Sequence, residues 1–330
     1  MDLIDGFNRK ISYLRVSVTD RCDLRCQYCM KEKTTFLPKK DLLTLEEIER
    51  LCDNFIDLGV SKIRLTGGEP LVRKNIIQLI NILGSKIRKT KLKELTITTN
   101  GTLLSEYARK LSESGVKRIN VSLDTLNKDK YNKITRYGDI NKVLTGIKIA
   151  QKFNIKIKIN TVAIKNFNED EFESIINWCS DNNMDVSFIE VMPMNETESP
   201  RHLQFLALSD VFDKLNNIYN FIKTEKNTGG PSRYYNSLKL KNNIGFISPL
   251  TNNFCANCNR VRITSTGRLY MCLGQNNYID FRDILRKDYS NDYIKEKIYL
   301  ALKLKPEKHD FIIEKNVKPY MTRFMNVTGG

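Results

Sequence analysis

Residues 11–30 read ISYLRVSVTDRCDLRCQYCM, and they give the clearest indication of the fold. Its first nine residues form a short β-branched run that predicts a strand. Three cysteines follow directly, at Cys22, Cys26 and Cys29. In α/β barrels the loops at the carboxyl ends of the strands carry the active site. We therefore expect an α/β protein with functional cysteines in the loop after its first strand.

Outward from this loop, short β-branched runs alternate with helical stretches. Thr44 and Glu47 have the spacing of a capping box at the start of one helix, and Gly59 is placed to end it. Six β–α units of this kind predict a mostly parallel sheet with helices outside, closer to a partial TIM-type barrel than to a closed eightfold one. We assign residues 1–192 to this barrel. Residues 193–330, with short strands and further cysteines, are predicted to form an α+β extension.

Size and composition suit a globular protein, since 41% of the 330 residues are hydrophobic and 28% are charged. The amino-terminal residues lack a signal-peptide core, and no run of about 18 apolar residues occurs. We therefore expect a cytoplasmic protein without a membrane partner. In that reducing compartment the eight cysteines favour metal binding or catalysis over disulfides.

The formal net charge of +16 has two interpretations. One is an anionic partner such as nucleic acid or a polyphosphate. The other is a solvated, lysine-rich surface. Because the basic residues form no block and no aromatic residues interleave with one, the surface explains most of the charge. We expect no nucleic-acid partner.

The cysteines carry the strongest chemical signal. Each iron of a [4Fe–4S] cluster takes one external thiolate, so three cysteines leave one iron open to bind a substrate atom. Six of the eight cysteines form two such triplets, Cys22, Cys26 and Cys29, and Cys255, Cys258 and Cys272. We predict one cluster at each triplet.

Structural zinc is the alternative, and it takes four ligands. A tetrad of Cys26 and Cys29 with Cys255 and Cys258 would leave one cysteine of each triplet unused. The two remaining cysteines, Cys52 and Cys179, lie on apolar faces of predicted helices and are interpreted as small buried side chains.

Residues 19–30 resemble the CxxxCxxC loop of radical S-adenosylmethionine (SAM) enzymes, in which an aromatic residue precedes the third cysteine. TGGEP at residues 66–70 resembles the glycine-rich strand end whose backbone faces SAM in those enzymes, and glycine permits such an approach. FCANCNRVRITSTGRLYMCL at residues 254–273 is similar to the second cluster motif of the GTP 3′,8-cyclase family. Further motifs of that family match along almost the whole chain.

The resemblance implies two [4Fe–4S] clusters, with SAM at the first and GTP at the second. A 5′-deoxyadenosyl radical would remove the C3′ hydrogen of GTP, and the carbon radical would attack C8. The product is 3′,8-cyclo-7,8-dihydro-GTP, made in the first step of molybdenum cofactor biosynthesis. The positions that match GTP-binding residues are Arg15, Arg64, Thr98, Lys158, Arg260 and Arg262. Those that match SAM-binding residues are Tyr28, Gly68, Ser122 and Met192.

Fork-shaped guanidinium groups suit phosphate oxygens, which makes the arginines chemically sensible for a nucleoside triphosphate. The resemblance also implies an electron donor such as flavodoxin or ferredoxin, and a cyclic pyranopterin monophosphate synthase that takes the product. It leaves a homodimer open. Gly329 and Gly330 match a terminal glycine pair that reaches into the active site of this family and positions the substrate.

Four positions depart from the family pattern. Asp23 replaces a usual asparagine, Lys31 a common proline, and Thr328 an aliphatic residue before the terminal glycines. Ser187 stands where an arginine is typical, which puts one anion contact in doubt.

Two other classes of protein stay open. A radical SAM maturase acting on a peptide would be favoured by more than three cysteines in the carboxyl-terminal region, which are absent here. A zinc-stabilised nucleic-acid-binding protein would need closed cysteine tetrads and a basic face. Iron, sulfide and zinc analysis of anaerobically purified protein distinguishes these classes.

Overall fold

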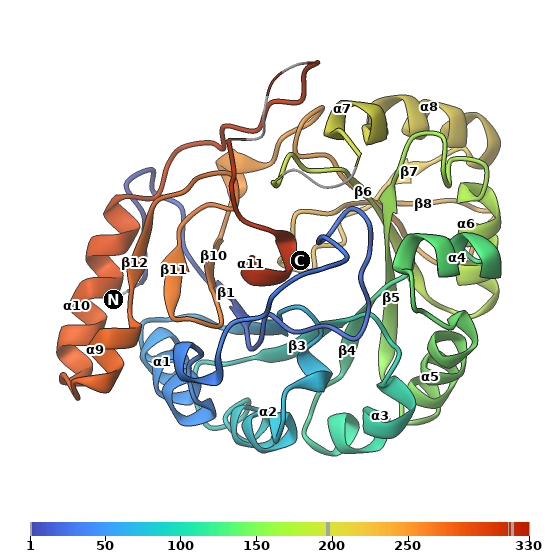
Figure 1. The fold of residues 1–330 in the computed structure, drawn as a ribbon. Coiled ribbons are helices and arrows are strands. Elements are labelled where there is room, and N and C mark those ends of the chain that lie inside the picture. Colours follow the sequence, from blue (N-terminus) through green and yellow to red (C-terminus); the bar gives the residue numbers. More distant parts are fainter. Residues whose placement is uncertain (1, 196–198, 316, 318–319, 330) are drawn as a thin grey trace.

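One curved sheet forms the framework of the protein (Figure 1). In the computed structural model, which describes residues 2–195, 199–315, 317 and 320–329, it has twelve strands in the order β12-β11-β10-β1-β2-β3-β4-β5-β6-β9-β8-β7. The strands are β1 Tyr13–Ser17, β2 Lys62–Thr66, β3 Glu94–Thr99, β4 Arg118–Ser122, β5 Lys156–Ala163, β6 Asp185–Glu190, β7 Ile222–Lys223, β8 Arg233–Asn236, β9 Ile244–Ile247, β10 Arg260–Ile263, β11 Arg268–Tyr270 and β12 Tyr278–Asp280.

The helices lie mostly outside this sheet. Figure 1 shows α1 to α6 around its outer side, in blue to green, whereas the short red helix α11 lies inside the ring of strands. The helices are α1 Leu45–Asp57, α2 Ile76–Ser85, α3 Leu104–Glu113, α4 Lys128–Thr135, α5 Ile140–Lys152, α6 Phe172–Asp181, α7 Arg201–Gln204, α8 Leu208–Tyr219, α9 Arg282–Arg286, α10 Asn291–Lys303 and α11 Met325–Thr328. Among the described residues, no helix combines the length and the apolar character that crossing a membrane requires.

The predicted α/β architecture is confirmed, and so is the capping box predicted at Thr44 and Glu47. Thr44 caps α1: its side chain accepts a hydrogen bond from the Glu47 amide, and the Glu47 side chain accepts one from the Thr44 amide. Cys52 and Cys179 are fully buried on α1 and α6, as predicted.

The parallel part of the sheet is larger than the six predicted β–α units. Strands β1 to β6 are parallel neighbours, but β10 also pairs in parallel with β1, and β9 pairs in parallel with β6. These additional strands come from residues 244–263, beyond the predicted barrel. Strands from both sides of residue 192 hydrogen-bond into one sheet, so the sheet itself marks no boundary there. The domain division at residue 192 stays a prediction.

Strand alternation separates a packed outer face from a functional inner face. On β1, Leu14 and Val16 join the apolar core beneath the helices. Tyr13 and Arg15 point the other way and line a pocket. Because successive side chains of a strand point to opposite faces, the same strand can stabilise the fold and present charge to the interior.

Candidate active site

The loop after β1 brings the first three cysteines into one pocket. Cys22, Cys26 and Cys29 all line it. The Cys29 amide donates to the Cys26 carbonyl oxygen at 2.9 Å, which forms a tight turn between the last two thiols. The loop is held on the end of α4, where the Arg25 amide donates to the Thr135 carbonyl oxygen at 3.1 Å. The spacing of the motif thus produces a three-thiol pocket at the carboxyl end of the sheet.

This donor set fits a cluster better than a single ion. Among the described residues, no three His, Cys, Asp or Glu side chains are grouped as one metal ion would require. A cubane presents a separate iron to each thiolate, so its ligands surround it instead of meeting at one point. Burial raises the pKa of Cys29 to about 11, against the lowering effects of Arg201 and of a backbone hydrogen bond from Asn326. Binding iron would supply the positive charge that a buried thiolate needs.

The glycine-rich turn after β2 packs directly on the cysteine loop. A Cβ atom on Gly68 would lie 2.2 Å from the Arg21 carbonyl oxygen, and one on Gly67 would lie 2.4 Å from that of Thr19. The Gly68 amide donates to the same Thr19 oxygen at 2.8 Å. The sequence predicts that glycine here allows the close approach of a ligand. In the structure, a close neighbour of the turn is the backbone of the cysteine loop itself.

Glu69 completes this turn as a fully buried hydrogen-bond acceptor. It accepts from the Thr99 hydroxyl at 2.8 Å and from the backbone amides of Asn100 at 2.7 Å and Leu71 at 3.0 Å. Burial raises the pKa of Glu69 to about 7 in spite of these bonds. The carboxylate therefore ties the ends of β2 and β3 together beside the first cysteine.

The four predicted SAM residues converge. Tyr28, Gly68, Ser122 and Met192 line the same pocket as the first three cysteines, although they come from four separate segments. Their roles toward SAM stay a prediction.

Asp124 is a site residue that the sequence analysis did not predict. Its carboxylate binds the hydroxyl group of Tyr28. The Tyr28 hydroxyl donates to Asp124 Oδ2 at 2.7 Å, while the Val162 amide donates to Oδ1 at 2.8 Å. Strand alternation could have indicated it, because Asp124 lies two residues after Ser122 and would share its face if the strand continued.

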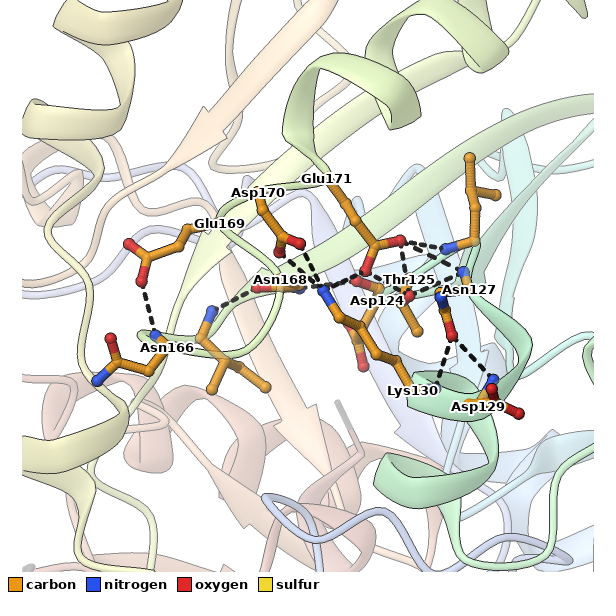
Figure 2. A network of polar contacts seen from close by, with 12 residues as sticks. Asp124, Thr125, Asn127, Asp129, Lys130, Asn166, Asn168, Glu169, Asp170 and Glu171 are labelled. Carbon is orange, nitrogen blue, oxygen red and sulfur yellow. Dashed lines mark hydrogen bonds and ion pairs between the residues drawn. The ribbon is translucent and has the colours of Figure 1, made fainter.

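Asp124 is part of a network of polar contacts (Figure 2). The Asn168 side-chain amide donates to the Asp124 carbonyl oxygen at 2.7 Å. Next to it, the Thr125 hydroxyl donates to Glu171 at 2.7 Å, and Lys130 forms an ion pair with Glu171 at 3.0 Å. Figure 2 shows these residues linking the loop after β4 to the loop after β5. The network fixes the part of the pocket wall against which Tyr28 rests.

The second triplet lines a neighbouring pocket. Cys255 and Cys258 lie on a short 3-10 turn, and Cys272 follows β11. The structure thus puts the cysteine pairs of the zinc alternative in different pockets. Lys305, another residue without a sequence signal, is buried and donates to the Cys258 thiol at 3.5 Å. Burial acts to raise the pKa of Cys258, but the charges of Arg260 and Lys305 bring it below its ordinary value.

Five basic side chains surround this second pocket. They are Arg15, Arg64, Lys158, Arg260 and Arg262. Strand register explains the convergence, because Arg15 on β1 is level with Arg64 on β2 and with Arg262 on β10. Thr98, the sixth predicted GTP residue, lines the first pocket and accepts a hydrogen bond from Arg64 at 2.9 Å.

The electrostatics of this pocket favour a polyanion. No Asp or Glu occurs among the described residues that line it. Burial, together with the charges of Arg64 and Arg260, lowers the pKa of Arg15 to about 10. Tyr13 is buried, yet the surrounding cations lower its pKa to about 8. Several buried positive charges without a lining carboxylate would be relieved by a ligand with several negative charges.

The two pockets share a wall. Asn160, Ile189, Met192 and Met325 line both of them. A molecule in the first pocket and a molecule in the second would therefore both lie next to these four side chains.

The carboxyl-terminal tail enters this region. Arg262 donates to the Gly329 carbonyl oxygen at 2.6 Å. Gly329 has a φ of 76°, and a Cβ atom on it would lie 2.4 Å from the Thr66 side chain. Both observations explain why glycine occupies this position. Gly330 lies outside the described residues.

Comparisons with known proteins agree with this geometry. A family model described as the Radical SAM superfamily matches residues 16–179, and one described as Molybdenum Cofactor Synthesis C matches residues 184–311. The GTP 3',8-cyclase of Brucella ovis is 53% identical over 329 residues, covering 99% of this chain and 96% of that protein. The enzyme of the same name from Brucella abortus has the same identity and coverage. The chain belongs to the GTP 3′,8-cyclase family.

Solved structures of proteins outside this family have a similar fold. Streptococcus suis SuiB bound to S-adenosylmethionine has a TM-score of 0.63 and 16% identity, covering 89% of this chain and 68% of that one. SuiB bound to precursor peptide SuiA has a TM-score of 0.61 and 16% identity, covering 96% and 76%. At this identity the likeness concerns the fold alone.

Three of the four departures from the GTP 3′,8-cyclase pattern have local structural accounts. Ser187 is buried on β6 and lies 2.8 Å from the Ser232 hydroxyl, which lines the cationic pocket. Asp23 accepts hydrogen bonds from the side chains of Asn100 at 2.7 Å and Thr102 at 2.5 Å. Thr328 is fully buried in α11. Lys31 is exposed, and nothing in the structure explains it.

Proposed function

We propose that this chain is a GTP 3′,8-cyclase, which converts GTP to 3′,8-cyclo-7,8-dihydro-GTP in the first step of molybdenum cofactor biosynthesis. One observation carries the proposal: two three-thiol pockets share a wall, and one of them is lined by five cations and no described carboxylate. Such a pair of pockets can hold a radical source beside an anionic substrate.

The residues divide between these two tasks. The first cysteine triplet would hold one [4Fe–4S] cluster, and Tyr28, Gly68, Ser122 and Met192 would hold SAM. The second triplet would hold the other cluster, which would then lie in the pocket expected to bind GTP. When bound, the first cluster and SAM would supply the radical chemistry that the cyclisation of GTP requires.

The protein itself binds, orients and excludes water. The arginines and Lys158 would neutralise the triphosphate, and fork-shaped guanidinium groups fix its oxygens geometrically. The apolar side chains Ile189, Met192 and Met325 line both pockets and would keep water from the place where the two meet. Holding both reactants at one wall converts an encounter in solution into a reaction within a single complex.

We also propose the cellular setting. We expect a reducing cytoplasm, because six of the eight cysteines are assigned to iron–sulfur clusters and not to disulfides. The enzyme would take electrons from a donor such as flavodoxin or ferredoxin and pass its product to a cyclic pyranopterin monophosphate synthase.

The decisive experiment compares two triple variants after anaerobic reconstitution. The parent should contain about eight irons, and each variant about four, because each loses one cubane. Replacing Cys22, Cys26 and Cys29 with Ala should abolish both SAM cleavage and GTP cyclisation. Replacing Cys255, Cys258 and Cys272 with Ala should leave reductive SAM cleavage but remove GTP turnover.

The control is Cys52→Ala, since Cys52 is buried in the core and lines neither pocket. It should keep about eight irons and both activities. Cyclisation at the parent rate by the second triple variant would contradict a substrate-binding role for the second cluster. Stoichiometric zinc without labile sulfide in the parent would contradict the whole proposal.

A further inference from the structure

Arg201 is a buried cation that no motif indicated. It lies at the start of α7, only 8% exposed, and it lines the first cysteine pocket. Among the described residues that line that pocket it is the one basic side chain, whereas the second pocket has five. A buried guanidinium is costly unless its donors are used, so its contacts indicate its task.

Those contacts are directed at one short segment after β6. Arg201 donates from Nη2 to the Met194 carbonyl oxygen at 2.6 Å and from Nε to that of Asn195 at 3.3 Å. Its third nitrogen, Nη1, donates to Gln204 at 3.1 Å on the same short helix. The guanidinium fork therefore clamps two consecutive carbonyl groups, which a point-charge amine could not do as rigidly.

The clamped segment in turn holds the carboxyl-terminal tail. The Asn195 amide donates to the Met321 carbonyl oxygen at 2.8 Å, and its side-chain amide donates to that of Thr322 at 2.6 Å. Met194 and Met321 also form a parallel β-bridge. The tail is thus docked, 127 residues away in sequence, on the two residues that Arg201 fixes.

From this anchor the tail runs between the pockets. Met325 lines both pockets. The Asn326 side chain donates to the Asp20 carbonyl oxygen at 2.9 Å, at the start of the cysteine loop. Gly329 then reaches Arg262 of the cationic pocket. A shift at Met321 or Thr322 would consequently be transmitted to both pockets.

We propose that Arg201 is a positioning residue that docks the carboxyl-terminal tail through Met194 and Asn195, and so keeps SAM cleavage coupled to GTP cyclisation. The coupling of SAM cleavage to GTP cyclisation rests on the proposed function. The docking of the tail does not, because it concerns contacts within the protein. Arg201 acts through the segment it clamps and not on GTP directly.

The first test is Arg201→Met, which keeps much of the side-chain volume and removes the donors. Its control is Leu203→Ala on the same helix, where the side chain is 59% exposed. Hydrogen–deuterium exchange of peptides covering residues 320–329 should quicken roughly tenfold in Arg201→Met and stay at the parent rate in the control. Unchanged exchange in Arg201→Met would overturn the docking role.

The second readout is the ratio of 5′-deoxyadenosine to cyclised GTP in the anaerobically reconstituted enzyme. The ratio should rise about tenfold or more in Arg201→Met, because the tail no longer positions the substrate. Partial unfolding would lower both products together and leave the ratio unchanged. Loss of SAM cleavage with the ratio unchanged would therefore overturn the proposal, and Arg201→Lys should restore the ratio only in part.

Asn195→Gly tests the same path at its next step. Asn195 has a φ of 43°, so glycine removes the side-chain amide without straining the backbone. Its effect on exchange should be smaller than that of Arg201→Met, and the two effects should not add, because both act on one segment. Additive effects would contradict a shared path. A parent enzyme that protects its tail but forms no cyclised GTP would refute the proposed function and leave the docking role intact.

Discussion

At the scale of single residues, the cationic pocket holds positively charged side chains close to one another. Arg262 is buried close to Arg15 and Arg260, and burial with these charges brings its pKa well below the ordinary value. The folded protein therefore carries an electrostatic cost that a bound polyanion would offset. Binding and stability are linked at this site, since a ligand that relieves the repulsion also stabilises the fold.

Arg260→Ala should weaken GTP binding by about 1.5–3 kcal/mol, the range for a lost charge-assisted hydrogen bond. This corresponds to roughly ten- to a hundredfold in the dissociation constant, measured by equilibrium binding to the anaerobic holoenzyme. Arg109→Ala is the control, because Arg109 is exposed on α3 and forms an ion pair with the likewise exposed Glu113 on the same helix. Equal affinities of parent and Arg260→Ala would show that this arginine does not contact GTP.

At the scale of elements, the active-site loop depends on a turn that leaves no room for side chains. The turn after β2 packs its two glycines on the backbone of residues 19–21. Glu69 then ties the same turn to β3 through Thr99 and Asn100. The position of the cysteine loop is therefore set by the ends of two neighbouring strands as well as by its own sequence.

Gly68→Ala should displace the cysteine loop, because the new Cβ atom would meet backbone oxygens at 2.2 and 2.8 Å. Overpacking of this kind costs roughly 1–3 kcal/mol. We expect a lower melting temperature and a loss of iron from the first cluster, measured by iron content in the background of the second-triplet Ala variant.

The matched substitution is Gly6→Ala, where the nearest atom would be 3.9 Å away. It should leave iron content and melting temperature unchanged. A Gly68→Ala protein that retained its iron would show that the loop can move away from the turn without losing its cluster.

At the scale of the whole molecule, segments from near both ends of the sequence meet at the candidate active site. Its first strand carries Arg15, its tenth carries Arg262, and its last described residue, Gly329, accepts a hydrogen bond from Arg262. Residues near both ends of the sequence therefore build one pocket. Such an arrangement makes the tail part of the site, although a terminal glycine pair is ordinarily dispensable.

Deleting Gly329 and Gly330 should leave both clusters and SAM cleavage intact and nearly abolish cyclised GTP. The physical reason is loss of positioning, since small errors in the geometry of reacting groups cost orders of magnitude in rate. Iron content, 5′-deoxyadenosine and cyclised product are measured on one preparation. Full cyclisation by the shortened enzyme would show that the tail plays no part in the reaction.

Features that depend on short-range spacing could be predicted from the sequence alone. The first cysteine triplet, the Cys255–Cys258 pair, the capping box at Thr44 and Glu47, and the apolar periodicity within each strand or helix involve residues only a few positions apart. Backbone geometry relates such residues directly, so periodicity and spacing were sufficient to predict them. The family resemblance extended this to the residues expected around SAM and GTP.

Only the tertiary structure decided which distant residues meet. The register of β10, β1 and β2 brings Arg262, Arg15 and Arg64 level with one another, and pairing with β1 and β6 makes β10 and β9 part of the parallel sheet. The contact of Asp124 with Tyr28 and that of Asn195 with Thr322 likewise join segments that are far apart in the chain. No local pattern encodes these contacts, because they depend on how complete elements pack and on the loops that packing brings together.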